Sequence, residues 1–259
     1  MSKTEELLHD LSDKGQPALI GYFPAGYPTV EDSVEASVAM CESGIDILEL
    51  GVPYSDPVMD GLVIQVATEQ ALANGFKLNM FFDMVKQITS RVETPVLVMS
   101  YWNPIMQYGV ERFARDLKAA GGAGLITPDL IPDEASDWLR YSEELDLDRV
   151  FMATPSSSQK RLDQVAKLSR GFIYAVSTMG ITGAREDLDA KARGVVSGVR
   201  ETHTQVPVCV GIGISTADQV TEVNSYADGA IVGSVFIKAY RDGGISELRK
   251  TVKQLKGGM

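Results

Sequence analysis

Short apolar segments alternate with longer amphipathic segments along the whole chain. Eight runs rich in β-branched and aromatic residues have the length and the continuous apolar character of strands that are buried on both faces. These predicted strands are residues 18–23, 46–50, 95–102, 124–129, 149–154, 171–177, 206–212 and 229–234. Their number and spacing indicate that one structural unit repeats eight times.

The segments between these runs have the spacing of amphipathic helices. In residues 30–44, for example, Thr29 is placed to cap the helix and Gly44 to end it. Ser215 or Thr216 would cap the last predicted helix. The other predicted helices are a short polar helix before the first strand and residues 110–122, 132–145, 158–169, 186–201 and 216–226.

Two architectures fit this alternation. Eight units are the number in a closed (β/α)₈ TIM barrel, which commonly uses about 250 residues as one domain, and this chain has 259. A doubly wound open sheet is the rival, but "PAGYP" stands where such a sheet usually has a glycine-rich turn after its first strand. We predict an α/β fold in which residues 1–259 form a single TIM-barrel domain with an extra N-terminal helix.

Composition narrows the range of partners. The formal net charge is -11, which disfavours nucleic acid and anionic membrane surfaces. No apolar run approaches the roughly 18 residues that cross a bilayer, and the N-terminal segment lacks the apolar core of a signal peptide. Cys41 and Cys209 lie far apart, without the spacing of a zinc site or a disulfide framework. We therefore expect a cytoplasmic protein with reduced thiols.

The active site of such a barrel lies at the C-terminal ends of the strands, and one of these ends holds a carboxylate. Glu49 shares a strand face with Ile45 and Ile47. If these isoleucines fill the interior, Glu49 projects into the mouth above them, where apolar surroundings raise its pKa and suit it to proton transfer. The alternative is a solvated glutamate at a strand end.

Three further residues mark the ends of other predicted strands. Phe23 ends the first strand, Tyr101 lies at the end of the third, and Asp129 ends the fourth. We expect Tyr101 and Asp129 to contact a substrate at this rim.

A second carboxylate, Asp60, follows Glu49 in the chain. It lies beyond Pro53 and Pro57, in a segment that we expect to be neither helix nor strand. Such a loop can fold over the mouth and bring Asp60 to the opposite side of a ligand. The alternative is that Asp60 belongs only to an Asp-Gly turn.

Glycines mark the ends of the last two predicted strands. "VGIGIS" (210–215) runs into a predicted helix, "VGS" (232–234) precedes "VFIKAYRDGG", and "GITGA" (180–184) could add a third glycine segment. Barrel enzymes often hold a phosphate at these loops through backbone N–H groups. We predict a phosphate site here, against the alternative that these glycines serve ordinary turns.

Several common catalytic groups are missing from the predicted strand ends. His9 and His203 lie elsewhere, the predicted strands contain no lysine, and no residues have metal-ligand spacing. The remaining chemistry is acid–base catalysis by carboxylates on a phosphorylated substrate.

Several motifs resemble those of one enzyme family. "LELGVPYSDPVMDG" (48–61) is similar to the signature of the tryptophan synthase alpha subunit family, and the other motifs of that family resemble "YFPAGYP", "SYWNPI", "PDLIPDEA", "STMGITGAR", "GIGIS" and "VGS". The resemblance covers nearly the whole chain. It implies retro-aldol-type cleavage of indole-3-glycerol phosphate to indole and glyceraldehyde 3-phosphate in tryptophan biosynthesis.

The resemblance also implies roles for individual residues. Glu49 would protonate C3 of the indole, and Asp60 would accept a hydrogen bond from the indole N–H. Tyr174 would position the substrate, and Thr182 would close onto the catalytic aspartate. The phosphate-loop positions would be Gly183, Gly211, Gly213, Gly233 and Ser234.

The family's partner is a pyridoxal-phosphate beta subunit that receives the indole in an alpha-beta-beta-alpha heterotetramer. No cofactor or metal is therefore expected in this chain, and Pro53 and Asp56 lie in the segment expected to face the partner. Two other functions stay open: a stand-alone lyase that releases free indole, and a non-catalytic barrel that activates the beta subunit. The intact pair of Glu49 and Asp60 favours catalysis over the last of these.

The chain departs from the family signature beside Asp60. Met59 replaces a common alanine, Leu62 replaces a common proline, and Tyr27 stands where many members have aspartate. Proline would fix φ at about -65° after Gly61, so leucine leaves the loop freer at this point.

We predict that Leu62→Pro tightens the Asp60 loop and raises the rate of indole formation. Steady-state kinetics with and without the beta subunit measure this effect, and kinetics that do not change in either condition contradict the prediction.

Overall fold

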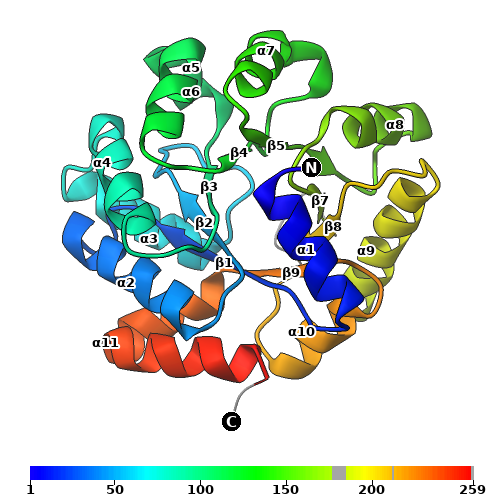
Figure 1. Cartoon of the computed structure of the whole chain (residues 1–259). Coiled ribbons are helices and arrows are strands. Elements are labelled where there is room, and N and C mark those ends of the chain that lie inside the picture. Colours follow the sequence, from blue (N-terminus) through cyan, green and yellow to red (C-terminus); the bar gives the residue numbers. More distant parts are fainter. Residues whose placement is uncertain (177–184, 212, 258–259) are drawn as a thin grey trace.

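A barrel of parallel strands surrounded by helices forms the body of the molecule (Figure 1). This computed structural model describes residues 1–176, 185–211 and 213–257, without the side chains of residues 185–188. The strands are β1 (Leu19–Pro24), β2 (Ile47–Gly51), β3 (Val96–Met99), β4 (Gly124–Ile126), β5 (Asp148–Val150), β6 (Met152–Ala153), β7 (Ile173–Val176), β8 (Val208–Gly211) and β9 (Gly229–Val232). The helices are α1 (Lys3–Asp13), α2 (Val30–Ser43), α3 (Leu62–Ala73), α4 (Leu78–Thr89), α5 (Trp102–Tyr108), α6 (Val110–Ala119), α7 (Ser136–Glu144), α8 (Gln159–Leu168), α9 (Arg185–Arg200), α10 (Ala217–Asn224) and α11 (Ser234–Leu255), with a 3₁₀ turn at Pro132–Glu134.

The sheet closes on itself through one short chain segment. Its strand order is β5-β4-β3-β2-β1-β9-β8-β7-β6, and the paired strands are parallel. The two ends of this order, β5 and β6, are separated in the chain only by Phe151. β5 pairs with β4 and β6 pairs with β7, so this segment joins the two edges. The predicted TIM barrel is confirmed, with the fifth predicted strand divided in two.

All eight predicted strands are present, most of them shorter than predicted, and three predicted helix caps are confirmed. The Thr29 side chain accepts a hydrogen bond from the backbone N–H of Asp32 at the start of α2, and Gly44 ends that helix in the left-handed conformation with φ 116°. Thr216, one of the two candidates, caps α10 in a capping box.

Four helices, α3, α4, α5 and α11, were not predicted from the sequence. Neither α3 nor α4 begins with a side-chain cap, so the usual sign of a helix start is missing. α3 has apolar residues on several faces, and α11 is interrupted by Gly243 and Gly244, whose dihedral angles are not helical. Tertiary packing rather than local signals therefore stabilises these helices.

The core has an outer layer between strands and helices and an inner layer inside the barrel. The inner layer contains Ile20, Ile47, Leu97, Ile126, Val150, Cys209 and Ile231 from the strands. α1 crosses the N-terminal end of the barrel (Figure 1) and adds Leu8 and Leu11 to this inner layer. Because side chains alternate along a strand, the next inward positions on β1, β2 and β3 are Tyr22, Glu49 and Met99. These side chains face the opposite, C-terminal mouth.

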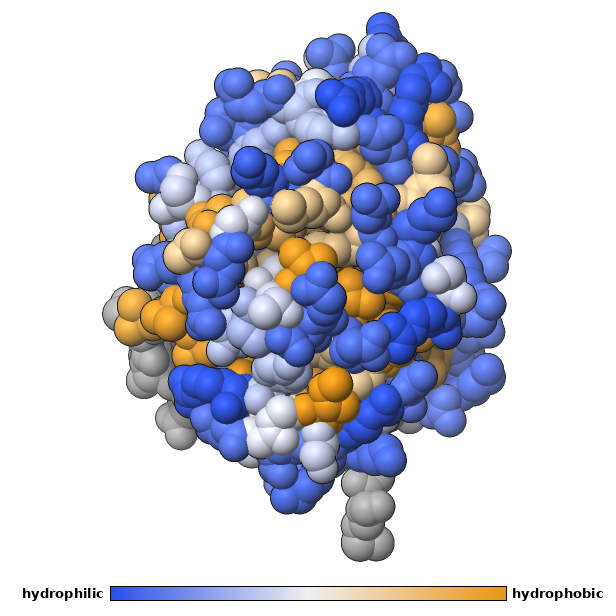
Figure 2. Space-filling view, turned by 90° about the vertical axis from the view of Figure 1, so that its left-hand side faces the viewer, coloured by the Kyte–Doolittle hydropathy of each residue, from blue (hydrophilic) through white to orange (hydrophobic). Residues whose placement is uncertain are grey.

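The side of the molecule that carries α2, α3 and α4 is covered mostly by hydrophilic residues, with hydrophobic residues between them (Figure 2). Among the helices that the structure describes, none is long and apolar enough to span a membrane.

We predict that Leu8→Ala lowers the free energy of unfolding by about 2–5 kcal/mol, because it removes a fully buried side chain from the inner layer. Urea denaturation measures the change. Asp10→Ala, on the exposed face of the same helix, is the control and changes stability by no more than about 0.5 kcal/mol. Equal effects of the two substitutions would show that α1 does not seal the barrel.

Candidate active site

A pocket of about 430 Å³ opens at the C-terminal mouth of the barrel. We name it the C-terminal pocket, and it is lined by Tyr22, Glu49, Met59, Asp60, Gly61, Ile64, Met99, Tyr174, Gly211, Gly213, Ile214, Ser215, Ile231, Gly233, Ser234, Val235 and Lys238. Seven residues predicted for the site are among them: Glu49, Asp60, Tyr174, Gly211, Gly213, Gly233 and Ser234. The structure thus brings both candidate carboxylates and four of the five predicted phosphate-loop residues to one cavity.

Glu49 lies on β2 at the floor of the C-terminal pocket. Ile47 packs in the inner layer as predicted, but Ile45 precedes the strand and packs in the outer layer, so that part of the prediction is wrong. Glu49 is only 1% exposed, which excludes the solvated-glutamate alternative. Its Oε1 atom has no hydrogen-bond partner among the described residues.

Burial raises the pKa of Glu49 to about 8, because an ionised carboxylate is poorly solvated in this environment. The side chain is therefore mostly a neutral carboxylic acid at pH 7. Such a group holds a proton that it can donate to a ligand.

Asp60 lies on the loop between β2 and α3, as predicted. Burial raises the pKa of its carboxyl to about 6, and a hydrogen bond from Tyr101 acts in the opposite direction. Asp60 is therefore mostly ionised at pH 7, when Glu49 is mostly protonated. Two carboxyl groups with different protonation states suit an acid role and an anionic role in one site.

Position 62 begins α3, and Gly61 is the cap residue with φ -72° and ψ 158°. This extended conformation suits a residue that precedes proline, and proline is favoured at the first position of a helix. The backbone can therefore accept Leu62→Pro without rearrangement. Its effect on activity stays a prediction.

Two tyrosines stand beside Glu49 and require glycine at neighbouring strand ends. Tyr22 pairs with Glu49 in the register of β1 and β2. A Cβ atom at Gly51 would lie 2.3 Å from the Tyr22 hydroxyl oxygen, and one at Gly211 would lie 2.5 Å from the Tyr174 hydroxyl oxygen. Gly211, predicted as a phosphate-loop residue, therefore also makes room for Tyr174.

Tyr22 was not predicted for the site, and Phe23 was predicted at the rim instead. Phe23 packs in the outer layer and is fully buried, because β1 extends to Pro24 and its inward face carries Ile20 and Tyr22. Strict alternation from Ile20 would have found Tyr22.

The part of the C-terminal pocket beside the ends of β8 and β9 is built from glycines and a helix N-terminus. Gly213 has a positive φ of 68°, and Gly233 is the cap residue of α11, which begins at Ser234. The first N–H groups of a helix have no partner within the helix and lie at the positive end of its dipole. This wall can therefore bind an anion such as a phosphate.

Two further polar residues on this wall were not predicted. Lys238 lies one turn after Ser234 and adds a positive charge to the pocket. Ser215 also lines the pocket, but its N–H donates to Gln219 Oε1 at 2.6 Å. The N-terminus of α11 is thus more open to a ligand than that of α10.

Four predicted site residues do not line the C-terminal pocket. Tyr101 lies behind the Asp60 loop, where its hydroxyl accepts a hydrogen bond from the backbone N–H of Met59 at 2.9 Å. Both Asp129 carboxylate oxygens accept hydrogen bonds from the backbone N–H of Trp102, at 2.9 and 3.1 Å. Pro53 is buried and Asp56 is exposed, whereas Thr182 and Gly183 fall outside the described residues.

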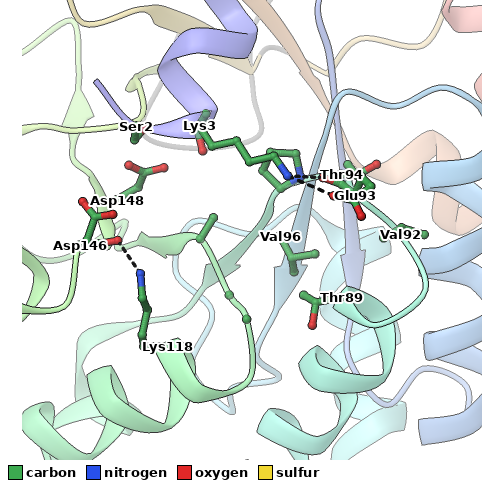
Figure 3. Close-up of a pocket in the computed structure, with 15 residues that line it drawn as sticks. Ser2, Lys3, Thr89, Val92, Glu93, Thr94, Val96, Lys118, Asp146 and Asp148 are labelled. Carbon is green, nitrogen blue, oxygen red and sulfur yellow. Dashed lines mark hydrogen bonds and ion pairs between the residues drawn. The ribbon is translucent and has the colours of Figure 1, made fainter.

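A second pocket, of about 290 Å³, lies at the N-terminal end of the barrel between α1 and the segments before β3, β4 and β5 (Figure 3). The two lysines that line it donate hydrogen bonds to backbone carbonyls. Lys3 donates to the Glu93 carbonyl at 3.0 Å and Lys118 to the Asp146 carbonyl at 3.2 Å. No predicted site residue lies there. In the described part of the chain, no cluster of histidine, cysteine, aspartate or glutamate could hold a metal ion.

Comparisons with known proteins agree with this geometry. The family model described as "Tryptophan synthase alpha chain" matches residues 8–257. The tryptophan synthase alpha chain of Leifsonia xyli is 57% identical over 258 residues, which cover 100% of this chain and 98% of that protein. The one from Mycolicibacterium paratuberculosis is 50% identical over 258 residues, covering 100% and 94%.

Solved structures show the same similarity. A structure of Mycobacterium tuberculosis tryptophan synthase superposes with a TM-score of 0.93 at 47% identity, covering 99% of this chain and 98% of that one. A tryptophan synthase complex from Pyrococcus furiosus gives 0.83 at 31% identity, covering 93% and 98%. A family match over residues 8–257, relatives at 50% identity or more and a shared fold lead to one conclusion: this chain belongs to the tryptophan synthase alpha chain family.

Proposed function

We propose that this chain is a carbon–carbon lyase that cleaves indole-3-glycerol phosphate to indole and glyceraldehyde 3-phosphate in tryptophan biosynthesis. The main support is one observation: a buried Glu49, with an oxygen that has no hydrogen-bond partner in the described part of the chain, shares a pocket with Asp60. The raised pKa values of about 8 and about 6 favour a protonated Glu49 and an ionised Asp60 at pH 7. The family match favours this function over a stand-alone lyase and over a non-catalytic partner.

Glu49 acts as the proton donor and then as the acceptor. It protonates C3 of the indole ring, which converts the ring to a cationic indolenine and makes the bond from C3 to the first glycerol carbon cleavable. The resulting carboxylate accepts the proton of the hydroxyl on that carbon. The bond then breaks, its electron pair returns to the ring to give indole, and the carbon becomes the aldehyde of glyceraldehyde 3-phosphate. Burial of Glu49 favours both proton transfers, because it raises the pKa of the carboxyl to about 8, which is close to neutral pH.

Asp60 stabilises the charge that forms during this step. As an anion it accepts a hydrogen bond from the indole N–H, which becomes more acidic when C3 is protonated. A charge-assisted hydrogen bond of this kind strengthens toward the transition state and so lowers the barrier. Tyr174 lies beside Glu49 on the pocket wall and positions the substrate.

The phosphate lies in the part of the C-terminal pocket beside the ends of β8 and β9. The N–H groups at the start of α11 and the backbone at Gly213 and Gly233 approach its oxygens, and the hydroxyl of Ser234 adds a donor. Lys238 supplies the neighbouring positive charge. Thr182 and Gly183 complete the site in this proposal, as the resemblance implies.

The beta subunit of tryptophan synthase is the proposed partner, in an alpha-beta-beta-alpha heterotetramer that holds pyridoxal phosphate in the beta subunits. The solved relatives support this, since they are described as tryptophan synthase and as a tryptophan synthase complex. Asp56 is exposed, and Val58 and Leu62 are 76% and 66% exposed beside the Asp60 loop. We place Pro53 and Asp56 in the segment that faces the partner, and we place the enzyme in the cytoplasm.

We predict that Glu49→Gln lowers the rate of indole formation by about 100-fold or more, because glutamine cannot donate the proton. Indole release from indole-3-glycerol phosphate, measured with and without the beta subunit, tests this. A variant that makes indole at the full rate would exclude Glu49 as the acid.

Stability provides the control for this variant. The unfolded chain ionises Glu49 above its ordinary pKa of 4.5, whereas the folded chain ionises it only near 8, so this group lowers stability as the pH rises between these values. Glu49→Gln removes that cost and raises the free energy of unfolding at pH 7, on the order of 3 kcal/mol. Lost activity in a more stable protein cannot be attributed to unfolding.

The pH dependence of kcat/KM follows from the same two groups. Asp60 must be ionised and its pKa of about 6 sets the acid limb, whereas Glu49 must be protonated and its pKa of about 8 sets the alkaline limb. We predict a bell-shaped profile between these values, with limbs that belong to the interacting pair. A rate that keeps rising beyond the pKa of Glu49 contradicts its role as the acid.

A further inference from the structure

The loop that carries Asp60 has little regular structure to fix it. Its hydrogen bonds near Asp60 are short-range ones, such as that from the Asp60 N–H to the Pro57 carbonyl at 3.3 Å. Two side chains from outside the loop hold it. Gln65 donates to the Asp60 carbonyl at 2.8 Å, and the Tyr101 hydroxyl accepts a hydrogen bond from the Met59 N–H at 2.9 Å.

Tyr101 connects the loop to a different part of the barrel. It follows β3 and is the cap residue of α5, and its side chain is only 5% exposed. Both carboxylate oxygens of Asp129 accept from the N–H of Trp102, the next residue. The Tyr101 ring also packs against Tyr54, with ring centroids 5.2 Å apart and an interplanar angle of 31°. These contacts with α5, Asp129 and Tyr54 restrict the position of the Tyr101 ring.

The phenol has one hydrogen to donate, and the Met59 contact leaves it free, because the hydroxyl oxygen is the acceptor there. The Asp60 carboxyl, on the next loop residue after Met59, can accept that hydrogen, and this interaction lowers the pKa of Asp60 against the effect of burial. A single hydroxyl is thus placed to interact with the backbone of one loop residue and the side chain of the next.

We propose that Tyr101 is a positioning residue for Asp60: its phenol ties the Met59 N–H to the Asp60 carboxylate and so holds that carboxylate over the C-terminal pocket. This inference rests on the proposed function of Asp60. It replaces the predicted substrate contact of Tyr101, which lies outside the lining of the pocket. Asp129, which follows β4, supports the same arrangement by accepting from the Trp102 N–H at the start of α5.

The arrangement has a consequence for the ionisation of Asp60. The groups that face it are Glu49, Tyr22, Tyr174 and Tyr101. None of these carries a positive charge, and Lys238, which lines the same pocket, does not contribute to the pKa shift of Asp60. The hydrogen bond from Tyr101 is therefore the interaction that favours the anion against burial. Removing it raises the pKa of Asp60.

Tyr101→Phe keeps the ring and removes only the hydroxyl. In the complex with the beta subunit, we expect kcat for indole formation to fall roughly tenfold or more, with a smaller change in KM because the phosphate wall is untouched. The acid limb of kcat/KM moves to higher pH by roughly half a unit or more. A residue that only stabilises the fold would not move this limb.

Tyr108→Phe is the matched control, since it removes a phenol that donates to the Asp116 carboxylate at 2.5 Å outside the site. It leaves kcat and the acid limb unchanged, and thermal unfolding compares the stability of both variants. If Tyr101→Phe keeps the kcat and acid limb of the unmodified enzyme while Glu49→Gln is inactive, the positioning role is overturned and the proposed function stands. If the unmodified chain forms no indole, both are overturned.

Discussion

The burial of the Glu49 carboxyl is the constraint on which the site depends. Filling the barrel interior with Ile20, Ile47 and Leu97 leaves a low-dielectric floor, and Glu49 is the next inward residue above it. An ionised carboxylate in this position is unfavourable, so the group keeps its proton near neutral pH. The fold accepts a cost in stability for this acid, a common compromise at active sites.

The two ends of the barrel have different roles. At the N-terminal end, α1 closes the inner layer, and Lys3 and Lys118 donate hydrogen bonds to backbone carbonyls. At the C-terminal end, short strands give way to glycines, loops and a helix N-terminus, which leave backbone N–H groups and two carboxyls facing one cavity. This arrangement separates the apolar packing that stabilises the barrel from the polar groups that act on a substrate.

Much of the fold was predictable because strands buried on both faces are visible as apolar runs. The eightfold repeat, the barrel and the caps at Thr29 and Thr216 follow from local patterns. Helices such as α3 and α11 were missed because they lack a side-chain cap or contain glycines, and packing against the barrel specifies them. Glu49 could be placed by strand alternation, but the start of β2 could not, which explains the wrong placement of Ile45.

The site was predictable where one strand end or one motif defines a residue. Glu49, Asp60 and the glycines after β8 and β9 are of this kind. The positions of Tyr101 and Asp129 were not, because both depend on how the loop after β2 meets the start of α5. Tyr22 lies in "YFPAGYP" and could have been found by strand alternation from Ile20, whereas Lys238 lies in none of the quoted motifs, and only the closed barrel shows that it shares a cavity with Glu49.

Difference infrared spectroscopy tests the central claim, because it detects a protonated carboxyl group directly. The spectrum of the unmodified protein at neutral pH, minus that of Glu49→Gln, should contain the carbonyl band of a neutral carboxylic acid, and this band should disappear as the pH rises past about 8. A difference spectrum that shows only an ionised carboxylate at neutral pH would contradict the account.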